Sequence, residues 1–171
     1  MNIADFPALK SLNPTQIENL RSACEVRRLS AGEELIRRGE QGGELYFLLE
    51  GELLVYVPGE GRDIELAELR APAVVGEIEF LTGSTRTASV RTLTEAEIMA
   101  IPQEGIQARI DDGDPAALKV MFAISRMIAA RLASLTEKFV EIETNSEPVR
   151  SDELRAFRVK LFSDWTFDQS P

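Results

Sequence analysis

The chain has 171 residues, of which 44% are hydrophobic and 28% are charged, a composition typical of one globular domain. Its net charge of −10 argues against a duplex DNA or anionic membrane partner, because binding to either depends on clustered Lys and Arg. It has no histidine and one cysteine, which excludes a Ser-His-Asp triad, histidine-ligated zinc or haem, and an internal disulfide. No segment has the character of a signal peptide or a membrane span, so we expect a cytoplasmic protein.

Residues 1–28 are predicted to be mainly helical. The run Asn13–Gln16 combines an N-cap residue, a proline at the first helical position and a glutamine three residues after the cap. Ile17, Leu20 and Cys24 then follow at helical spacing, and we expect Cys24 to be a small core residue rather than a reactive thiol.

Residues 29–101 are predicted to form short strands separated by turns. Two apolar runs, Leu45–Leu49 and Leu53–Val57, flank Glu50-Gly51-Glu52, which predicts a β-hairpin. Partial alternation predicts further strands at 64–69 and 88–93. Several short strands with glycine turns indicate a small antiparallel barrel or jelly roll.

The stretch Gly76–Val90 places a carboxylate, Glu77, nine residues before a guanidinium, Arg86. A carboxylate only accepts hydrogen bonds and suits a ribose 2′-OH, whereas the planar fork of an arginine suits two phosphate oxygens. Between them, residues 78–81 are predicted to form a helical turn whose N–H groups face an anion, after a glycine that lets the backbone approach the ligand. These groups fit a small ligand with one phosphate and one free sugar hydroxyl. The alternative is that Glu77 and Arg86 merely pair with each other on the surface.

Residues 102–142 are predicted to be helical, with helix starts at Pro102 and at Asp114-Pro115. Along the second helix, a stripe that is apolar except for Ser125 recurs at spacings of three and four over more than three heptads: Leu118, Met121, Ser125, Ile128, Leu132, Leu135, Phe139 and Ile142. Two explanations stay open. The stripe packs on the barrel, or it forms the seam of a homodimer through helix 115–142.

Residues 143–171 are predicted to be a linker followed by a short amphipathic helix. Large apolar residues recur in this segment: Leu154, Phe157, Leu161, Phe162, Trp165 and Phe167. We expect the helix to cover the ligand site, the dimer mate or a partner protein, and a frayed end is the alternative. Fewer than thirty residues follow residue 142, which we expect to be too few for a winged DNA-binding domain.

The stretch Gly76–Val90 resembles the phosphate-binding cassette of cyclic-nucleotide-binding domains, the family of the catabolite activator protein and the regulatory subunits of cAMP-dependent kinase. Gly76-Glu77-Ile78 and Arg86-Thr87-Ala88-Ser89-Val90 match its pattern, and a second block, Ala31–Gly51, resembles the family's early strands. The likeness covers about residues 5–142. It implies a mainly β domain over 1–142, an antiparallel β jelly roll with an N-terminal helix and a long C-terminal helix.

The resemblance also implies a ligand and a role. The ligand is cAMP as first choice and cGMP as second, with no metal, and the residues that bind it are Gly76, Glu77, Ile78, Arg86, Thr87 and Ala88. The implied function is a sensor that is not an enzyme and that relays binding to a partner protein through helix movement. The rival reading is a degenerate relative without a ligand, acting as a dimeric protein-interaction module.

One residue departs from the family pattern. Glu79 stands where the family usually has Ala, Ser or Gly. We expect its carboxylate to matter little if it points to solvent, and to oppose the ligand phosphate if it points inward.

Overall fold

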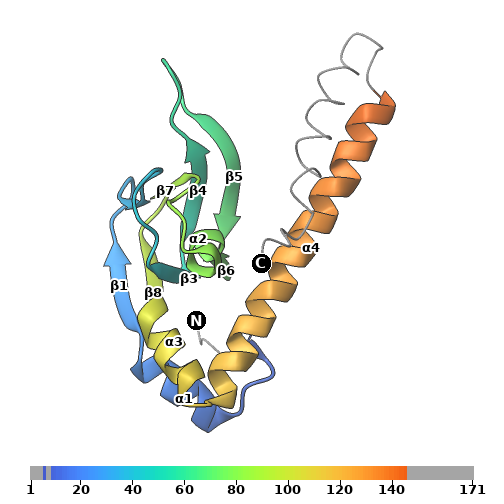
Figure 1. The fold of residues 1–171 in the computed structure, drawn as a ribbon. Helices are drawn as coiled ribbons and strands as arrows, with labels where there is room; N and C mark the ends of the chain where they lie inside the picture. The colour runs from blue at the N-terminus through green and yellow to red at the C-terminus, as the bar shows by residue number, and fades with distance from the viewer. Residues whose placement is uncertain (1–5, 7–8, 146–171) are drawn as a thin grey trace. The chain divides into compact units, whose positions relative to one another are not determined.

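The computed structural model describes residue 6 and residues 9–145. The chain divides into two compact units, Met1–Ser125 and Arg126–Pro171. The helices and strands follow one another in the order α1 (Pro14–Ser22), β1 (Glu25–Leu29), β2 (Glu34–Ile36), β3 (Glu44–Glu50), β4 (Glu52–Val57), β5 (Ile64–Arg70), β6 (Ala73–Val75), α2 (Glu77–Thr82), β7 (Ser89–Thr92), β8 (Ala96–Pro102), α3 (Gln103–Asp111) and α4 (Pro115–Asn145) (Figure 1).

The eight strands in the described residues form two antiparallel sheets of four strands each. One sheet has the order β1-β8-β3-β6 and the other β2-β7-β4-β5. Buried aliphatic side chains from both sheets form one core cluster, which includes Ile36, Leu48, Leu53, Val90 and Ile98. The predicted antiparallel β jelly roll, with an N-terminal helix and a long C-terminal helix, is confirmed.

Strands β3 and β4 form where the sequence predicts them, but the predicted hairpin between them is wrong. β3 pairs with β6 and β8, whereas β4 pairs with β5 and β7, so the chain crosses from one sheet to the other at Gly51. All five residues of Leu45–Leu49 are buried. β3 therefore needs packing partners on both of its faces, which a solvated hairpin would not provide.

The predicted helix over residues 1–28 is confirmed only in part. Helix α1 spans Pro14–Ser22 and has the predicted capping box, in which Asn13 Oδ1 accepts from the Gln16 N–H at 2.9 Å and Gln16 Oε1 accepts from the Asn13 N–H at 3.1 Å. Residues Glu25–Leu29 instead form β1, which pairs with β8 along its whole length. Pairing with a central strand overrides the helical spacing there.

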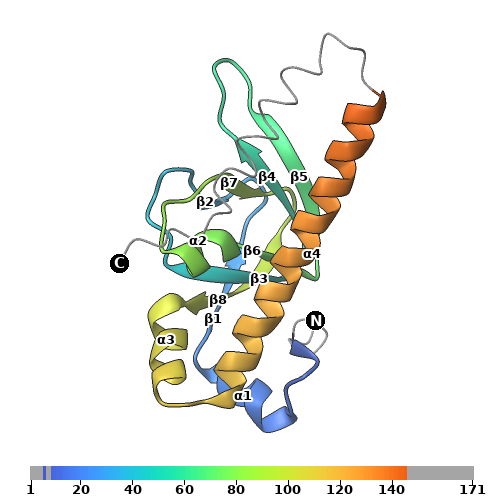
Figure 2. The same ribbon diagram turned by 45° about the vertical axis from the view of Figure 1, so that its right-hand side comes forward.

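Helices α3 and α4 begin where the sequence predicts, after Pro102 and at Pro115. The Asp114 carboxylate holds the α3–α4 corner, because it accepts from the Ala116 N–H at 2.8 Å and pairs with Arg109 at 2.7 Å. In Figure 2, α1 and α3 lie beside each other, and the Arg109 Nη1 donates to the carbonyl of Asn19 at 2.8 Å.

Helix α4 buries a different stripe from the one predicted. In unit 1 its buried residues are Ala116, Ala117, Val120 and Ile124. The side chains of Leu118 and Leu135, two members of the predicted seam, are 52% and 61% exposed. The helix runs to Asn145, three residues past its predicted end, and the predicted amphipathic helix beyond it lies outside the described residues. Within residues 9–145, no helix is long and apolar enough to cross a membrane.

Candidate functional site

The stretch singled out in the sequence forms a short helix between two strands. Strand β6 ends at Val75, and Gly76 then adopts a φ of 80°, which turns the chain into α2. This left-handed conformation favours glycine. Helix α2 ends at Thr82 with Gly83 as its C-cap, and a loop leads through Arg86 to β7.

The backbone of Arg86 is fixed by the loop between β2 and β3. The Arg86 N–H donates to the carbonyl of Glu40 at 2.8 Å, and the Arg86 carbonyl accepts from the Gly39 N–H at 2.8 Å. Gln41 adds a side-chain bond from Nε2 to the carbonyl of Gly83 at 3.1 Å. The β2–β3 loop, more than forty residues earlier in the sequence, thus holds the loop that contains Arg86.

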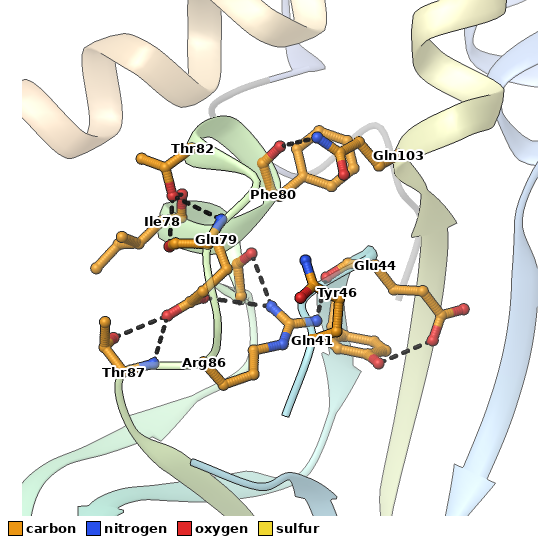
Figure 3. Close-up of polar contacts among 12 residues, drawn as sticks. Gln41, Glu44, Tyr46, Ile78, Glu79, Phe80, Thr82, Arg86, Thr87 and Gln103 are labelled. Carbon is orange, nitrogen blue, oxygen red and sulfur yellow. Dashed lines mark hydrogen bonds and ion pairs between the residues drawn. The ribbon is translucent and has the colours of Figure 1, made fainter. Parts of the chain in front are cut away.

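The Arg86 side chain points into the protein and is 5% exposed. Its Nη2 donates to the carbonyl of Glu44 at 2.7 Å, and its Nη1 donates to the carbonyl of Gly76 at 3.1 Å (Figure 3). The guanidinium carbon lies 5.7 Å from the centre of the Tyr46 ring. Burial and a hydrogen bond to Glu44 raise the pKa of Tyr46 to about 12, so this ring carries no charge of its own at neutral pH.

The Glu79 carboxylate completes the surroundings of Arg86. Its Oε2 lies 3.3 Å from Arg86 Nη1, while its Oε1 accepts from both the backbone N–H and the hydroxyl of Thr87 at 2.8 Å (Figure 3). Glu79 is 4% exposed. Burial acts to raise the pKa of this carboxyl, but the bonds from Thr87 and Arg86 outweigh it and hold the pKa below its ordinary value of 4.5. The carboxylate is therefore ionised at neutral pH.

Two glycines make this close packing possible. A Cβ at Gly76 would lie 2.7 Å from Arg86 Nη1, and a Cβ at Gly42 would lie 2.5 Å from the Cβ of Glu79. Gly42 in the β2–β3 loop therefore lies directly against Glu79.

The structure brings the predicted site residues together in one segment with different exposures. Glu77 is buried at the start of α2, Ile78 is exposed, Ala88 is half-buried, and Thr87 is exposed with its N–H bonded to Glu79. The alternative of a surface pair between Glu77 and Arg86 is wrong, because Arg86 is buried and pairs with Glu79. The direct contact of any of these residues with a ligand stays a prediction.

Sequence reasoning missed the contribution of the β2–β3 loop and of β3 to this site. Gly42 and the carbonyl of Glu44 contact Glu79 and Arg86, and the block that contains them was assigned only to strands and turns. A backbone carbonyl carries no sequence signal, so Glu44 could not be found that way. Gly42, in a Gly-Gly pair ahead of a strand, is a signal that a close approach could have explained.

The described residues outside this stretch offer neither a cluster of metal ligands nor a reactive thiol. No group of three or more His, Cys, Asp or Glu side chains among the described residues could hold a metal ion. Cys24 is half-buried, and its Sγ lies 2.9 Å from the carbonyl of Leu20. Burial raises the pKa of the Cys24 thiol to about 11, which leaves it unreactive at neutral pH.

Known proteins share this fold and this stretch. The family model described as "Cyclic nucleotide-binding domain" matches residues 26–112, slightly more than half of the chain. A cGMP-dependent protein kinase, egl-4 of Caenorhabditis briggsae, is 36% identical over 99 residues, which are 58% of this chain and 13% of the kinase. A cAMP-dependent protein kinase regulatory subunit from Emericella nidulans is 28% identical over 105 residues, 61% of this chain and 25% of that protein. This chain therefore spans a minor part of the curated relatives that it matches.

Solved structures agree on the fold. The crystal structure of the Thermus thermophilus Catabolite Activator Protein superposes with a TM-score of 0.69 at 23% identity, covering 81% of this chain and 64% of that one.

Proposed function

Because the chain belongs to the cyclic nucleotide-binding domain family, we propose that it is a non-catalytic sensor module that binds cAMP or cGMP. The module would pass the signal to a partner protein through movement of its helices. Differential affinity of the ligand for two conformations would supply the free energy of that movement.

One observation carries the proposal. The Arg86 guanidinium and the N–H and hydroxyl of Thr87 all donate to one anionic group, at distances of 2.8 to 3.3 Å. A cyclic phosphate carries the same kind of oxygens, and charge-assisted bonds of this type are among the strongest available to a protein. Arg86 is buried, and hydrogen bonds gain strength where water is excluded.

The remaining predicted residues would bind the sugar or let the ligand approach the main chain of the protein. Glu77 is a buried carboxylate one residue after Gly76, and we assign it to the ribose 2′-OH. Gly76 and Ala88 are small enough to let the ligand approach the main chain, and Ile78 offers an exposed apolar surface.

The base is not decided by this segment. Thr87 is compatible with either purine, and the similar proteins include one named for cGMP and one named for cAMP. We keep cAMP as the first candidate and cGMP as the second.

A second candidate function is favoured by the position of Glu79. A carboxylate already satisfies the donors that a phosphate would need. On that reading the domain is a relative without a ligand that works as a dimeric protein-interaction module. The exposed Leu118, Phe122 and Leu135 of α4 would belong to its dimer contact.

Calorimetric titration with cAMP and cGMP, up to about 5 mM ligand, separates the two functions. The sensor predicts saturable binding that weakens at least tenfold in Arg86→Ala. Arg28→Ala is the matched control, because the Arg28 side chain is 87% exposed and its loss removes the same charge. Absence of binding to the wild-type protein would favour the interaction module, and equal binding by Arg86→Ala would overturn the site.

A further inference from the structure

The donors of the cassette are already engaged by the protein itself. We propose that Glu79 is an internal oxyanion that occupies the phosphate position, so that a cyclic nucleotide binds by displacing its carboxylate from Arg86 and Thr87. The inference rests on the proposed function and adds a residue that sets the affinity and the conformational response of the same site.

The hydrogen bonds indicate that the Glu79 carboxylate occupies the phosphate position and does more than form an ion pair with Arg86. Both Glu79 oxygens are used, Oε2 by Arg86 and Oε1 twice by Thr87. No buried side-chain nitrogen or oxygen among the described residues lacks a hydrogen-bond partner, so the ligand-free site is already satisfied. An ordinary empty phosphate site would instead leave its arginine to water.

A phosphate and this carboxylate exclude each other on electrostatic grounds. Both are anions, and the donors that offset a negative charge are the same three groups. Glu79 is 4% exposed, so little water screens the repulsion between the two groups. The carboxylate must leave its position when the phosphate enters.

The base of the Glu79 side chain is tightly packed. Gly42 packs so closely that an added Cβ there would lie 2.5 Å from the Cβ of Glu79. We therefore expect the departure of the Glu79 carboxylate to move α2 or the β2–β3 loop, which pack together at the base of this side chain. The carbonyl of the next residue, Phe80, accepts from Gln103 Nε2 at 2.9 Å, so a shift of α2 would disturb the first residue of α3 (Figure 3).

Three variants test the inference. Glu79→Ala removes the internal anion, and Glu79→Gln removes its charge while keeping its size. Glu68→Gln is the control, because Glu68 is an exposed carboxylate on β5 and its loss changes the net charge equally. Circular dichroism checks that each variant is folded.

We expect Glu79→Ala to bind cAMP or cGMP at least tenfold more tightly than the wild-type protein, Glu79→Gln to lie between them, and Glu68→Gln to stay within twofold. Inorganic phosphate should raise the melting temperature of Glu79→Ala but not that of the wild-type protein. If Glu79→Ala folds only with phosphate present, that rescue supports the inference as well.

The failures are distinguishable. Unchanged or weaker nucleotide binding by a folded Glu79→Ala overturns the inference and leaves the proposed function intact. Stabilisation of Glu79→Ala by phosphate, with no nucleotide binding by any variant, keeps the internal oxyanion and overturns the proposed function. If no variant binds a nucleotide and phosphate does not stabilise Glu79→Ala, the inference and the proposed function are both overturned.

Discussion

The Glu79 carboxylate lies 3.3 Å from the Arg86 guanidinium, and the two residues are 4% and 6% exposed. A pair this deeply buried responds to mutation differently from a surface ion pair, since removing one partner leaves the other charge without water or a counterion.

Arg86→Ala should therefore lower the free energy of unfolding by about 3–5 kcal/mol in urea denaturation. The double variant Arg86→Ala/Glu79→Ala should lose less than the sum of the two single variants, because it leaves no orphaned charge. Arg70→Ala is the control: its partner Glu52 and its own side chain are partly or largely exposed, so the loss should stay below about 1 kcal/mol. Additive losses would contradict the coupling.

Gly42→Ala should destabilise the domain by about 1–3 kcal/mol, because the new methyl group must push Glu79 or the loop aside. Gly43→Ala is the matched control, since nothing lies within 4 Å of a Cβ at that position. Thermal unfolding of both variants measures the destabilisation. An equal loss of stability at the two positions would show that crowding at Glu79 is not the cause.

Glu77→Ala should weaken cAMP binding and leave 2′-deoxy-cAMP binding nearly unchanged, because the deoxy analogue lacks the hydroxyl that we assign to this carboxylate. Loss of one charged hydrogen bond predicts an effect of about tenfold or more. Parallel titrations of both ligands give the answer, and equal losses would remove the ribose role.

Acid should destabilise the protein partly through Glu79. Its pKa is held below 4.5 in the folded state, so its contribution is complete above pH 4.5 and is lost as the pH falls through the lower, folded-state pKa. Asp114 acts in the same sense, since its pKa is lowered by the N–H of Ala116 and by Arg109. The unfolding free energy of Glu79→Gln, measured between pH 7 and pH 3, should decline less steeply than that of the wild-type protein. Identical slopes would contradict the ionised, bonded state.

Leu135→Asp should convert a homodimer into folded monomer, because it places a charge in the predicted seam of α4. Leu135 is 61% exposed in the single chain, so the substitution should not disturb the monomer fold. Ala130→Asp is the control on another face of the helix. Light scattering of all three proteins is the measurement, and a wild-type protein that is monomeric at high micromolar concentration would refute the dimer.

The sequence predicted the parts of the fold whose causes are local. The Asn13–Gln16 capping box, the helix start at Pro115 and the apolar runs of β3 and β4 all act through near neighbours. The predicted hairpin and the helical assignment of residues 25–28 failed, because strand partners are chosen over long distances in the chain.

The same division holds at the site. The residue types around Arg86 are visible in one stretch of sequence, and so is the unusual presence of Glu79. Whether Glu79 points inward depends on the α2 geometry and on Gly42, more than thirty residues earlier. That contact arises only when the two loops meet in three dimensions.

The link between Glu79 and Arg86 has a consequence for selectivity. Only seven positions separate the two residues, so the carboxylate competes for its donors at an effective concentration of millimolar order or above. Free phosphate or acetate brings no additional contacts and gains nothing by replacing it. A nucleotide also brings a sugar and a base. Only such a ligand has further binding energy with which to displace the Glu79 carboxylate. The site thereby discriminates against common small anions without excluding them by size.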